Sequence, residues 1–323
     1  MEYGSIVGLD KPVARIVLGT MIVNAQEPER SRALLDAVFE RGGNTLDTAH
    51  GYAGGNSERG IGDWMQARGV RDEVVIITKG CHHNADRKRV TPFDLTSDLF
   101  DSLARLRTDT IDLYFLHRDD PDVPVGEIVD VLNEHYAAGR IRAFGGSNWT
   151  HERIAEANAY ARTNGLVPFV ASSPNYGLAD QIENPWGEGC VTLSAPRNAD
   201  ARAWYQREAM PVFAYSSLAR GLFSGRVTRA NYSETVEMLD GACRRAYCHE
   251  PNIQRLDRAH ELAAEKGITV PQLVLAFLFA SPLDVFPIVG AANGDEYAEN
   301  LAAFDVELTS QECAWLDLES DTR

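Results

Sequence analysis

Residues 74–79 of the chain read VVIITK, a short apolar run without interruption that ends in a lysine. A strand that is apolar at every position is buried on both faces, which is typical of a parallel sheet covered by helices. Seven other runs have a similar strand-like composition, and longer amphipathic stretches separate them. We expect eight strands, at Ile16–Gly19, Asn44–Asp47, Val74–Lys79, Ile111–His117, Ala143–Ser147, Phe169–Ser173, Val212–Tyr215 and Val285–Val289.

The stretches between these strands carry apolar residues at i, i+3, i+4 and i+7, the spacing of a helix with one buried face. Small polar residues precede several of the expected helix starts, namely Thr91, Thr150, Asn198 and Thr269. We expect helices at Ser31–Arg41, Leu95–Leu106, Val125–Ala138, Glu152–Thr163 and Ile253–Lys266.

Eight alternating strands and helices predict a (β/α)8 TIM barrel that forms a single domain over residues 1–323. A doubly wound sheet is the competing α/β fold. Its dinucleotide-binding versions usually carry G-x-G-x-x-G in the first strand-to-helix turn, and LGTMIVNAQEPER at residues 18–30 lacks it. Two long segments, Tyr176–Asn198 and Leu218–Pro251, are expected as long loops at the carboxyl-terminal face of the barrel, either functional lids or partly ordered insertions.

Charge and composition exclude several partners. The chain has 323 residues and a formal net charge of −16, which disfavours nucleic acid and anionic membrane surfaces. No apolar run approaches the roughly 18 residues that a membrane helix needs, and the first residues lack the layout of a signal peptide. The five cysteines are scattered without a C-x-x-C motif, so we expect reduced thiols in a cytoplasmic protein.

Polar residues end four successive expected strands. They are Asp47, Lys79, His117 and the pair Ser147 and Asn148, and Tyr52 follows Asp47 by five residues. Catalytic groups of a (β/α)8 barrel come from the carboxyl-terminal ends of its strands and from the loops that follow. We therefore expect these side chains to meet at one rim of the barrel.

A phenol, an ammonium, a carboxylate and an imidazole together suit proton donation to a carbonyl oxygen. A phenol has an ordinary pKa near 10, and a neighbouring cation such as Lys79 favours its ionised form. Asp47 would hold Lys79 charged and in place, Tyr52 with a lowered pKa would donate the proton, and His117 would orient the oxygen. No side chain carries hydride, so this chemistry requires a nicotinamide cofactor.

The chain resembles the aldo-keto reductase superfamily along almost its whole length. The resemblance rests on LDTAHGY at 46–52, NSE-x-G-x-G at 56–62, DLYFLH at 112–117, GGSNW at 145–149, YSSLARGLFSGR at 215–226 and VGAANGDEYAENLAAF at 289–304. It implies a (β/α)8 barrel whose lower end is closed by a β-hairpin, which residues 2–16 would form, with NADP(H) extended across the top. It also implies that Tyr52 is the general acid, that Lys79 and Asp47 tune it, and that His117 orients the substrate.

The same resemblance implies a set of cofactor contacts. Ser147 and Asn148 would bind the nicotinamide carboxamide and Tyr215 would stack on its ring. Leu218 and Gly221 would lie along the pyrophosphate, with Gly290, Glu299 and Asn300 around the adenosine.

Two positions depart from the family pattern. Ser173 stands where the family usually has a Gln that completes carboxamide binding, and Ser172 or Asn175 are alternatives for that role. The segment expected near the adenosine 2′-phosphate contains no cation but does contain Asp295 and Glu296, which disfavour a phosphate. NADP(H) and NAD(H) both stay open, since Arg220, Arg226 and Arg229 in the preceding loop are able to compensate.

These residues predict reversible hydride transfer between a nicotinamide cofactor and an aldehyde, a ketone or a sugar-derived carbonyl. Candidate substrate-pocket residues are His82, Trp149 and Trp186. We expect no metal, because neither KGCHHN at 79–84 nor the Cys243, Cys248 and His249 group has zinc-ligand spacing. The alternative function is a cofactor-binding, redox-sensing regulatory subunit with little turnover, and a divalent-metal barrel enzyme is the weakest alternative. The oligomeric state is not predicted.

Overall fold

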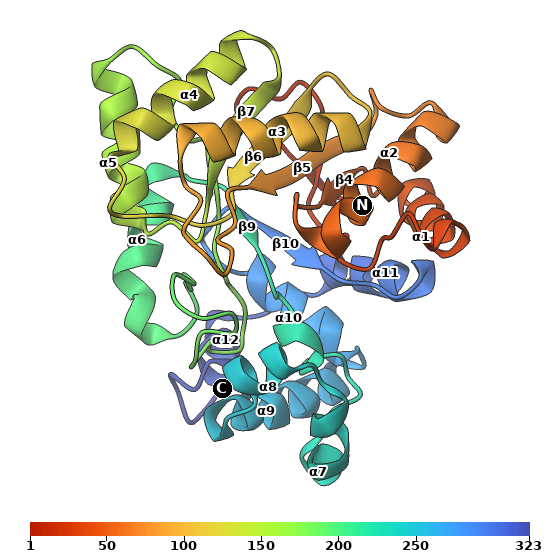
Figure 1. The fold of residues 1–323 in the computed structure, drawn as a ribbon. Helices are drawn as coiled ribbons and strands as arrows, with labels where there is room; N and C mark the ends of the chain where they lie inside the picture. Colours follow the sequence, from red (N-terminus) through yellow and green to blue (C-terminus); the bar gives the residue numbers. More distant parts are fainter. The chain divides into compact units, whose positions relative to one another are not determined.

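Eight parallel strands form a closed barrel in the computed structural model, which describes all 323 residues (Figure 1). The strand order is β10-β3-β4-β5-β6-β7-β8-β9, as expected for a (β/α)8 barrel. Every predicted strand is present, and its observed bounds differ by at most two residues at either end. The strands are β3 (Val17–Gly19), β4 (Thr45–Asp47), β5 (Val75–Gly80), β6 (Ile111–Leu116), β7 (Ile141–Ser147), β8 (Ala171–Ser173), β9 (Val212–Ala214) and β10 (Val285–Val289).

The chain divides into two compact units. The first unit comprises Met1–Ser173 with Gly290–Tyr297, and the second comprises Pro174–Val289 with Ala298–Arg323. Strands β3 to β8 belong to the first unit, and β9 and β10 belong to the second. The prediction of one domain over residues 1–323 stays a prediction.

Strands β5 and β6 form the buried centre of the sheet in the first unit. All six residues of each strand are buried, and they pair in parallel with Ile77 opposite Leu113 and Lys79 opposite Phe115. The helices that follow the strands pack their apolar faces inward and each contacts the next one along the chain. These helices are α1 (Pro28–Glu40), α2 (Asn56–Arg68), α3 (Pro92–Leu106), α4 (Val125–Ala137) and α5 (His151–Thr163).

Three of the four proposed helix caps are formed by side chains. The Thr91 side chain accepts from the backbone N–H of Asp94, and the Thr150 side chain accepts from the backbone N–H of Arg153 at the start of α5. Thr269 forms a capping box with Gln272. Asn198 also precedes a helix, but its side chain donates to the backbone oxygen of Ser194 and caps nothing.

The second unit is more helical than the sequence indicated. The segment Leu218–Pro251, expected as a loop, contains two α-helices and three 3-10 turns, because residues such as Phe223, Cys243 and Tyr247 are fully buried in one apolar cluster. The helices of this unit are α6 (Ala199–Glu208), α7 (Tyr232–Thr235), α8 (Gly241–Tyr247), α9 (Glu250–Lys266), α10 (Val270–Phe279) and α12 (Ser310–Leu316), and α11 (Gly294–Leu301) runs across the unit boundary.

The 3-10 turns are η1 (Tyr52–Gly55), η2 (Pro196–Asn198), η3 (Ala219–Gly221), η4 (Arg229–Asn231), η5 (Val236–Met238) and η6 (Ala302–Asp305). No single helix combines the length and the apolar character needed to cross a membrane. Helices α9 and α10 meet those criteria only when taken together, and they are bent by 98° against each other.

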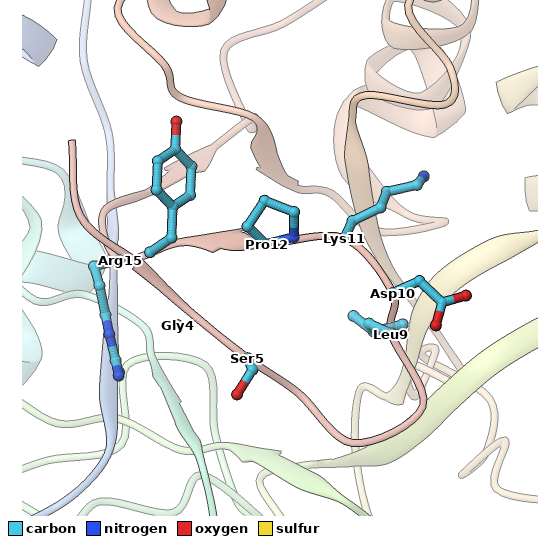
Figure 2. Close-up of a pocket in the computed structure, with 8 residues that line it drawn as sticks. Gly4, Ser5, Leu9, Asp10, Lys11, Pro12 and Arg15 are labelled. Atoms are coloured by element: carbon cyan, nitrogen blue, oxygen red, sulfur yellow. The ribbon is translucent and has the colours of Figure 1, made fainter.

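The predicted N-terminal hairpin is present and lies at the amino-terminal ends of the strands. Strands β1 (Tyr3–Gly4) and β2 (Val13–Ala14) pair antiparallel. The backbone N–H of Ala14 donates to the side chains of Asn44 and Thr45 at the start of β4, and Lys11 donates to the backbone oxygen of Val74 at 2.7 Å. Residues of this hairpin line a cavity of about 620 Å³. Figure 2 shows these residues along the two arms. This cavity is therefore far from the carboxyl-terminal strand ends, where a barrel enzyme places its chemistry.

Candidate active site

Asp47 and Lys79 form a buried ion pair at the carboxyl-terminal ends of β4 and β5. The two strands pair in register with Asp47 opposite Ile77, so Lys79 lies two residues further along on the same face. Its ammonium nitrogen lies 2.6 Å from Oδ1 of Asp47 and 2.9 Å from the backbone oxygen of Thr48. Both side chains are buried. A lysine held by two oxygens in this way is fixed in position and stays charged.

Tyr52 is directed toward this ion pair by an unusual turn. It opens η1, where its backbone N–H donates to Ala49, and the next three residues all adopt positive φ values before α2 begins. One of the three is Ala53 with φ 50°, a conformation that is costly without glycine and is found mostly at functional sites. The Lys79 nitrogen lies 5.3 Å from the centroid of the Tyr52 ring.

His117 completes the group from the end of β6. Its backbone N–H donates to Gly80 at 2.8 Å, which ties it to β5. The ring centroid lies 5.8 Å from that of Tyr52 and 4.7 Å from that of His82, both edge to face. Its Nδ1 atom is buried and has no protein partner. The four predicted tetrad residues are thus brought together in the first unit.

Electrostatics at Tyr52 differ from the sequence prediction. Burial raises the pKa of Tyr52 above its ordinary value, and the charge of Lys79 opposes this rise without cancelling it. The predicted lowering of the Tyr52 pKa was therefore wrong, because the sequence did not reveal that loss of hydration around the phenol outweighs the charge of Lys79. Tyr52 is consequently a protonated phenol at neutral pH, which is the form that donates a proton.

Lys79 keeps the charge that the sequence predicted, and the pKa of His117 is also shifted. Burial acts to lower the pKa of Lys79, but Asp47 and Tyr52 together outweigh it, so its pKa is raised and it stays an ammonium. Burial, followed by the charge of Lys79, holds the pKa of His117 well below its usual range. His117 is therefore a neutral imidazole.

Three carboxamide-binding candidates lie together at the ends of β7 and β8. The Ser147 hydroxyl donates to the backbone oxygen of Ser173 at 2.8 Å, and the Asn148 side-chain amide donates to the backbone oxygen of His117 at 3.3 Å. Asn148 has φ 58°, a conformation that asparagine tolerates better than most residues. Ser173 is fully buried, and its hydroxyl has no protein partner.

The predicted adenosine segment brings one cation that the sequence did not associate with it. The carboxylate of Glu296 accepts from the backbone N–H of Ala292 at 2.8 Å, and Gly290 is open to solvent. Arg41, at the end of α1, lies 3.6 Å from Asp295. The segment thus carries acidic side chains, but one arginine, Arg41, lies beside them.

The remaining cofactor candidates lie in the second unit. Tyr215 follows β9, and the centroid of its ring lies 5.9 Å from the centroid of the Trp186 ring. Leu218 directly precedes η3 and Gly221 is its last residue; Ala219, Arg220 and Gly221 in this turn all have positive φ. The Sγ of Cys243 donates to the backbone oxygen of Ala219 at 3.2 Å and supports this turn.

The cations proposed to compensate for Asp295 and Glu296 are mostly committed elsewhere. Arg220 pairs with Asp240 and also lies 5.1 Å from the Trp186 ring. Arg229 pairs with Glu250 and Asp257. Of the last two adenosine candidates, Asn300 is buried and the backbone oxygen of Glu299 accepts from Gln272.

The substrate-pocket candidates differ in exposure. His82 is exposed and touches His117, whereas Trp186 is 42% exposed and lies in the second unit. Trp149 is fully buried against Phe169, and its indole N–H donates to the backbone oxygen of Arg118 at 3.1 Å. Its ring can act on a substrate only through the residues around it. No three His, Cys, Asp or Glu side chains gather closely enough to hold a metal ion.

The aldo/keto reductase family model matches residues 15–318, which is most of the chain. The chain belongs to the aldo/keto reductase family. It is accordingly an NAD(P)H-dependent oxidoreductase, as the sequence predicted.

Named relatives of this aldo/keto reductase include a norsolorinic acid reductase of Emericella nidulans, 29% identical, with 93% of this chain and 76% of the relative covered. An aryl-alcohol dehydrogenase (NADP(+)) of Phanerodontia chrysosporium is 28% identical, with 93% and 77% covered.

Among solved structures, a glycerol dehydrogenase from Gluconobacter oxydans has a TM-score of 0.78 at 22% identity over 97% of this chain and 93% of its own, which supports the fold alone. An aldo/keto reductase from Klebsiella pneumoniae, in complex with NADP and acetate, has a TM-score of 0.69 at 27% identity over 97% and 93%.

A nicotinamide fits the residues present in this aldo/keto reductase. The Ser173 hydroxyl is a buried polar group without a protein partner, and such groups normally have one. A carboxamide has both donors and acceptors, so it is able to pair with that hydroxyl. Ser173 is the position at which the family usually has a Gln, so a serine hydroxyl is available there for the carboxamide.

Arg118 is the residue near this site that sequence reasoning missed. It follows His117 directly, yet its side chain is only 4% exposed. Its position directly after β6 was the only sequence feature that could have identified it, and the same position drew attention to His117. Burial of an arginine, however, is not visible in a sequence.

Proposed function

We propose that this protein catalyses reversible hydride transfer between NADP(H) or NAD(H) and an aldehyde, ketone or sugar-derived carbonyl, with Tyr52 as the proton donor in reduction. The observation that carries the proposal is the buried Asp47–Lys79 ion pair with the half-buried rings of Tyr52 and His117 beside it. A protonated phenol in contact with a fixed ammonium suits protonation of a carbonyl oxygen at neutral pH.

Tyr52 and Lys79 divide the proton chemistry between them. In reduction the Tyr52 hydroxyl donates its proton to the carbonyl oxygen, which leaves a phenolate. Lys79 stabilises that phenolate because its charge already acts on the Tyr52 hydroxyl. Asp47 keeps Lys79 protonated and prevents the ammonium from moving away. In oxidation the same phenolate accepts the alcohol proton.

His117 orients the carbonyl. As a neutral imidazole it is able to donate one N–H hydrogen bond to the substrate oxygen without competing with Tyr52 as an acid. Its Nδ1 has no protein partner, so hydrogen-bonding capacity remains for a ligand.

A bound nicotinamide cofactor supplies the hydride that no side chain carries. Ser147, Asn148 and Ser173 would hold its carboxamide. The other proposed contacts are Tyr215, Leu218, Gly221, Gly290, Glu296, Glu299 and Asn300. The names of two relatives contain NADP, which supports NADP(H), whereas Asp295 and Glu296 support NAD(H). We place the choice between the two cofactors at Glu296.

The test is an assay of NADPH and NADH oxidation by the pure protein with a panel of aldehydes, ketones and sugar-derived carbonyls, accompanied by cofactor titrations. We expect turnover with at least one carbonyl class and alcohol oxidation in the reverse direction. Tight cofactor binding without turnover in either direction would replace the proposal with the regulatory alternative.

A further inference from the structure

Arg118 is a buried cation without a counter-ion. The only hydrogen bond of its side chain to the protein runs from Nη1 to the backbone oxygen of His117, at 3.1 Å. The guanidinium has five N–H donors, and no carboxylate lies within ion-pairing distance of it. A buried charge is normally paired, because loss of hydration is costly without a partner.

The carboxylates close to Arg118 in the chain are all engaged by other cations. Asp119 accepts from Arg153 at 3.0 Å, and Asp120 pairs with Lys88 at 2.7 Å. The carboxylate of Asp47 is held by Lys79. An acidic protein with 47 Asp and Glu residues thus leaves this one buried arginine unpaired, beside its candidate active site.

The Arg118 charge acts on the residues of that site. Burial lowers the pKa values of His82, His83 and His117, and the charge of Arg118 adds to the lowering at all three. The same charge acts on Tyr52. Two buried ring nitrogens in this group, Nε2 of His83 and Nδ1 of His117, also lack protein partners. A cation and unpaired polar atoms therefore occur together next to the proposed proton donor.

We propose that Arg118 binds a carboxylate of the substrate, so that the preferred substrates are carbonyl compounds that carry a negative charge, such as aldehydic or keto acids. This inference rests on the proposed carbonyl reduction and narrows its substrate class. A guanidinium forms two parallel hydrogen bonds with a carboxylate, which compensates for the buried charge and fixes the orientation of the substrate. Arg118 is then a specificity-determining residue.

The experiment compares two nearly isosteric aldehydes, 4-carboxybenzaldehyde and 4-formylbenzamide, with the wild-type protein, Arg118→Gln and Arg118→Lys. Arg68→Gln is the matched control, because it removes the same charge from a partly exposed arginine of α2 that pairs with Asp36 and Glu40 of α1. For Arg118→Gln we expect the ratio of kcat/KM values, anionic to neutral, to fall on the order of 10- to 100-fold. The ratio should stay unchanged in Arg68→Gln and recover in part in Arg118→Lys.

Two results of this comparison would overturn the proposal. One is an unchanged ratio in Arg118→Gln. The other is an equal loss for both aldehydes together with weaker binding of the cofactor, which would assign Arg118 to the cofactor. Thermal unfolding serves as the folding check, and we expect Tm not to fall in Arg118→Gln because an unpaired buried charge is removed.

A binding measurement separates this proposal from the proposed function. Calorimetric titration of the protein with benzoate and with benzamide needs no turnover. Selective benzoate binding that Arg118→Gln loses and Arg68→Gln keeps would support the anion site, even if no carbonyl in the panel were reduced. Equal affinity of the wild-type protein for benzoate and benzamide would contradict the site, whether or not the reductase assay succeeds.

Discussion

The ammonium of Lys79 lies 2.6 Å from the Asp47 carboxylate, and both side chains are almost completely buried. Adjacent parallel strands deliver the two residues to the same rim, so the pair is set by sheet register and not by loop flexibility. Lys79 also acts on Tyr52. Its charge is the main influence that opposes the rise in the Tyr52 pKa caused by burial.

Lys79→Met should lower kcat for reduction by about 100-fold or more, since the phenolate would form without a neighbouring cation. The sign of the pH effect follows from the pKa of Tyr52, which burial already raises. Loss of the opposing charge raises it further, so the rise of alcohol oxidation with pH should move to higher pH. A pH profile of kcat/KM for oxidation measures this shift. Lys88→Met, a surface control, should leave the profile in place, and an identical profile in Lys79→Met would count against the tuning role.

His117→Ala should impair substrate binding and turnover by about 10- to 100-fold while the cofactor Kd stays nearly constant. His117→Gln should recover part of the loss because its amide keeps an N–H donor. Since the pKa of His117 lies well below its usual range, its neutral form persists and the wild-type rate should show no limb from this group between about pH 6 and 8. Steady-state kinetics and cofactor titration test both points. Weaker cofactor binding with an intact KM for the carbonyl would remove His117 from the substrate site.

Glu296→Arg should shift the ratio of kcat/KM values for NADPH and NADH toward NADPH by about 10-fold or more, because a carboxylate is replaced by a phosphate-binding guanidinium. The wild-type carboxylate accepts from the backbone N–H of Ala292, so the variant also needs a check of thermal stability. Glu307→Arg, an exposed change outside the segment, should not alter the ratio. The same ratio in all three proteins would mean that the 2′-phosphate is recognised elsewhere.

Asp94 links the fold to acid stability. Hydrogen bonding from Arg87 is the largest cause that lowers the pKa of Asp94 to about 2. The folded pKa lies below the unfolded value near 3.9, so this stabilisation is complete above about pH 4 and is lost as pH falls toward 2. Asp94→Asn should therefore reduce the free energy of unfolding by about 1 kcal/mol at pH 7, with a smaller difference at pH 2. Urea unfolding at both pH values measures the change, and a difference that grows on acidification would have the wrong sign.

The sequence predicted the barrel and the tetrad members at strand ends because both depend on strands. Runs such as residues 74–79 can be buried only in a sheet covered on both faces, and parallel register then places Asp47, Lys79 and His117 at one rim. Burial and ion pairing were not predictable in the same way. The raised pKa of Tyr52 reflects the loss of hydration around the half-buried phenol, and the unpaired charge of Arg118 depends on which partners Asp119 and Asp120 take.

Helical structure in Leu218–Pro251 escaped the sequence analysis for a related reason. Helix α8 has only seven residues, too few to show a periodic pattern. It is stabilised by long-range burial of Cys243 and Tyr247 and by the Asp240 cap. The choice of cofactor is equally hidden, because Arg41 reaches Asp295 from a helix more than 200 residues away in the chain.

The most direct test of the central claim is carbonyl reduction by Tyr52→Phe, measured beside the wild-type protein with the same cofactor and substrate. Loss of a single hydroxyl should abolish turnover while the cofactor Kd and Tm stay close to the wild-type values, because only the proton donor is removed. Comparable turnover in Tyr52→Phe would contradict the account and would require another group to protonate the carbonyl oxygen.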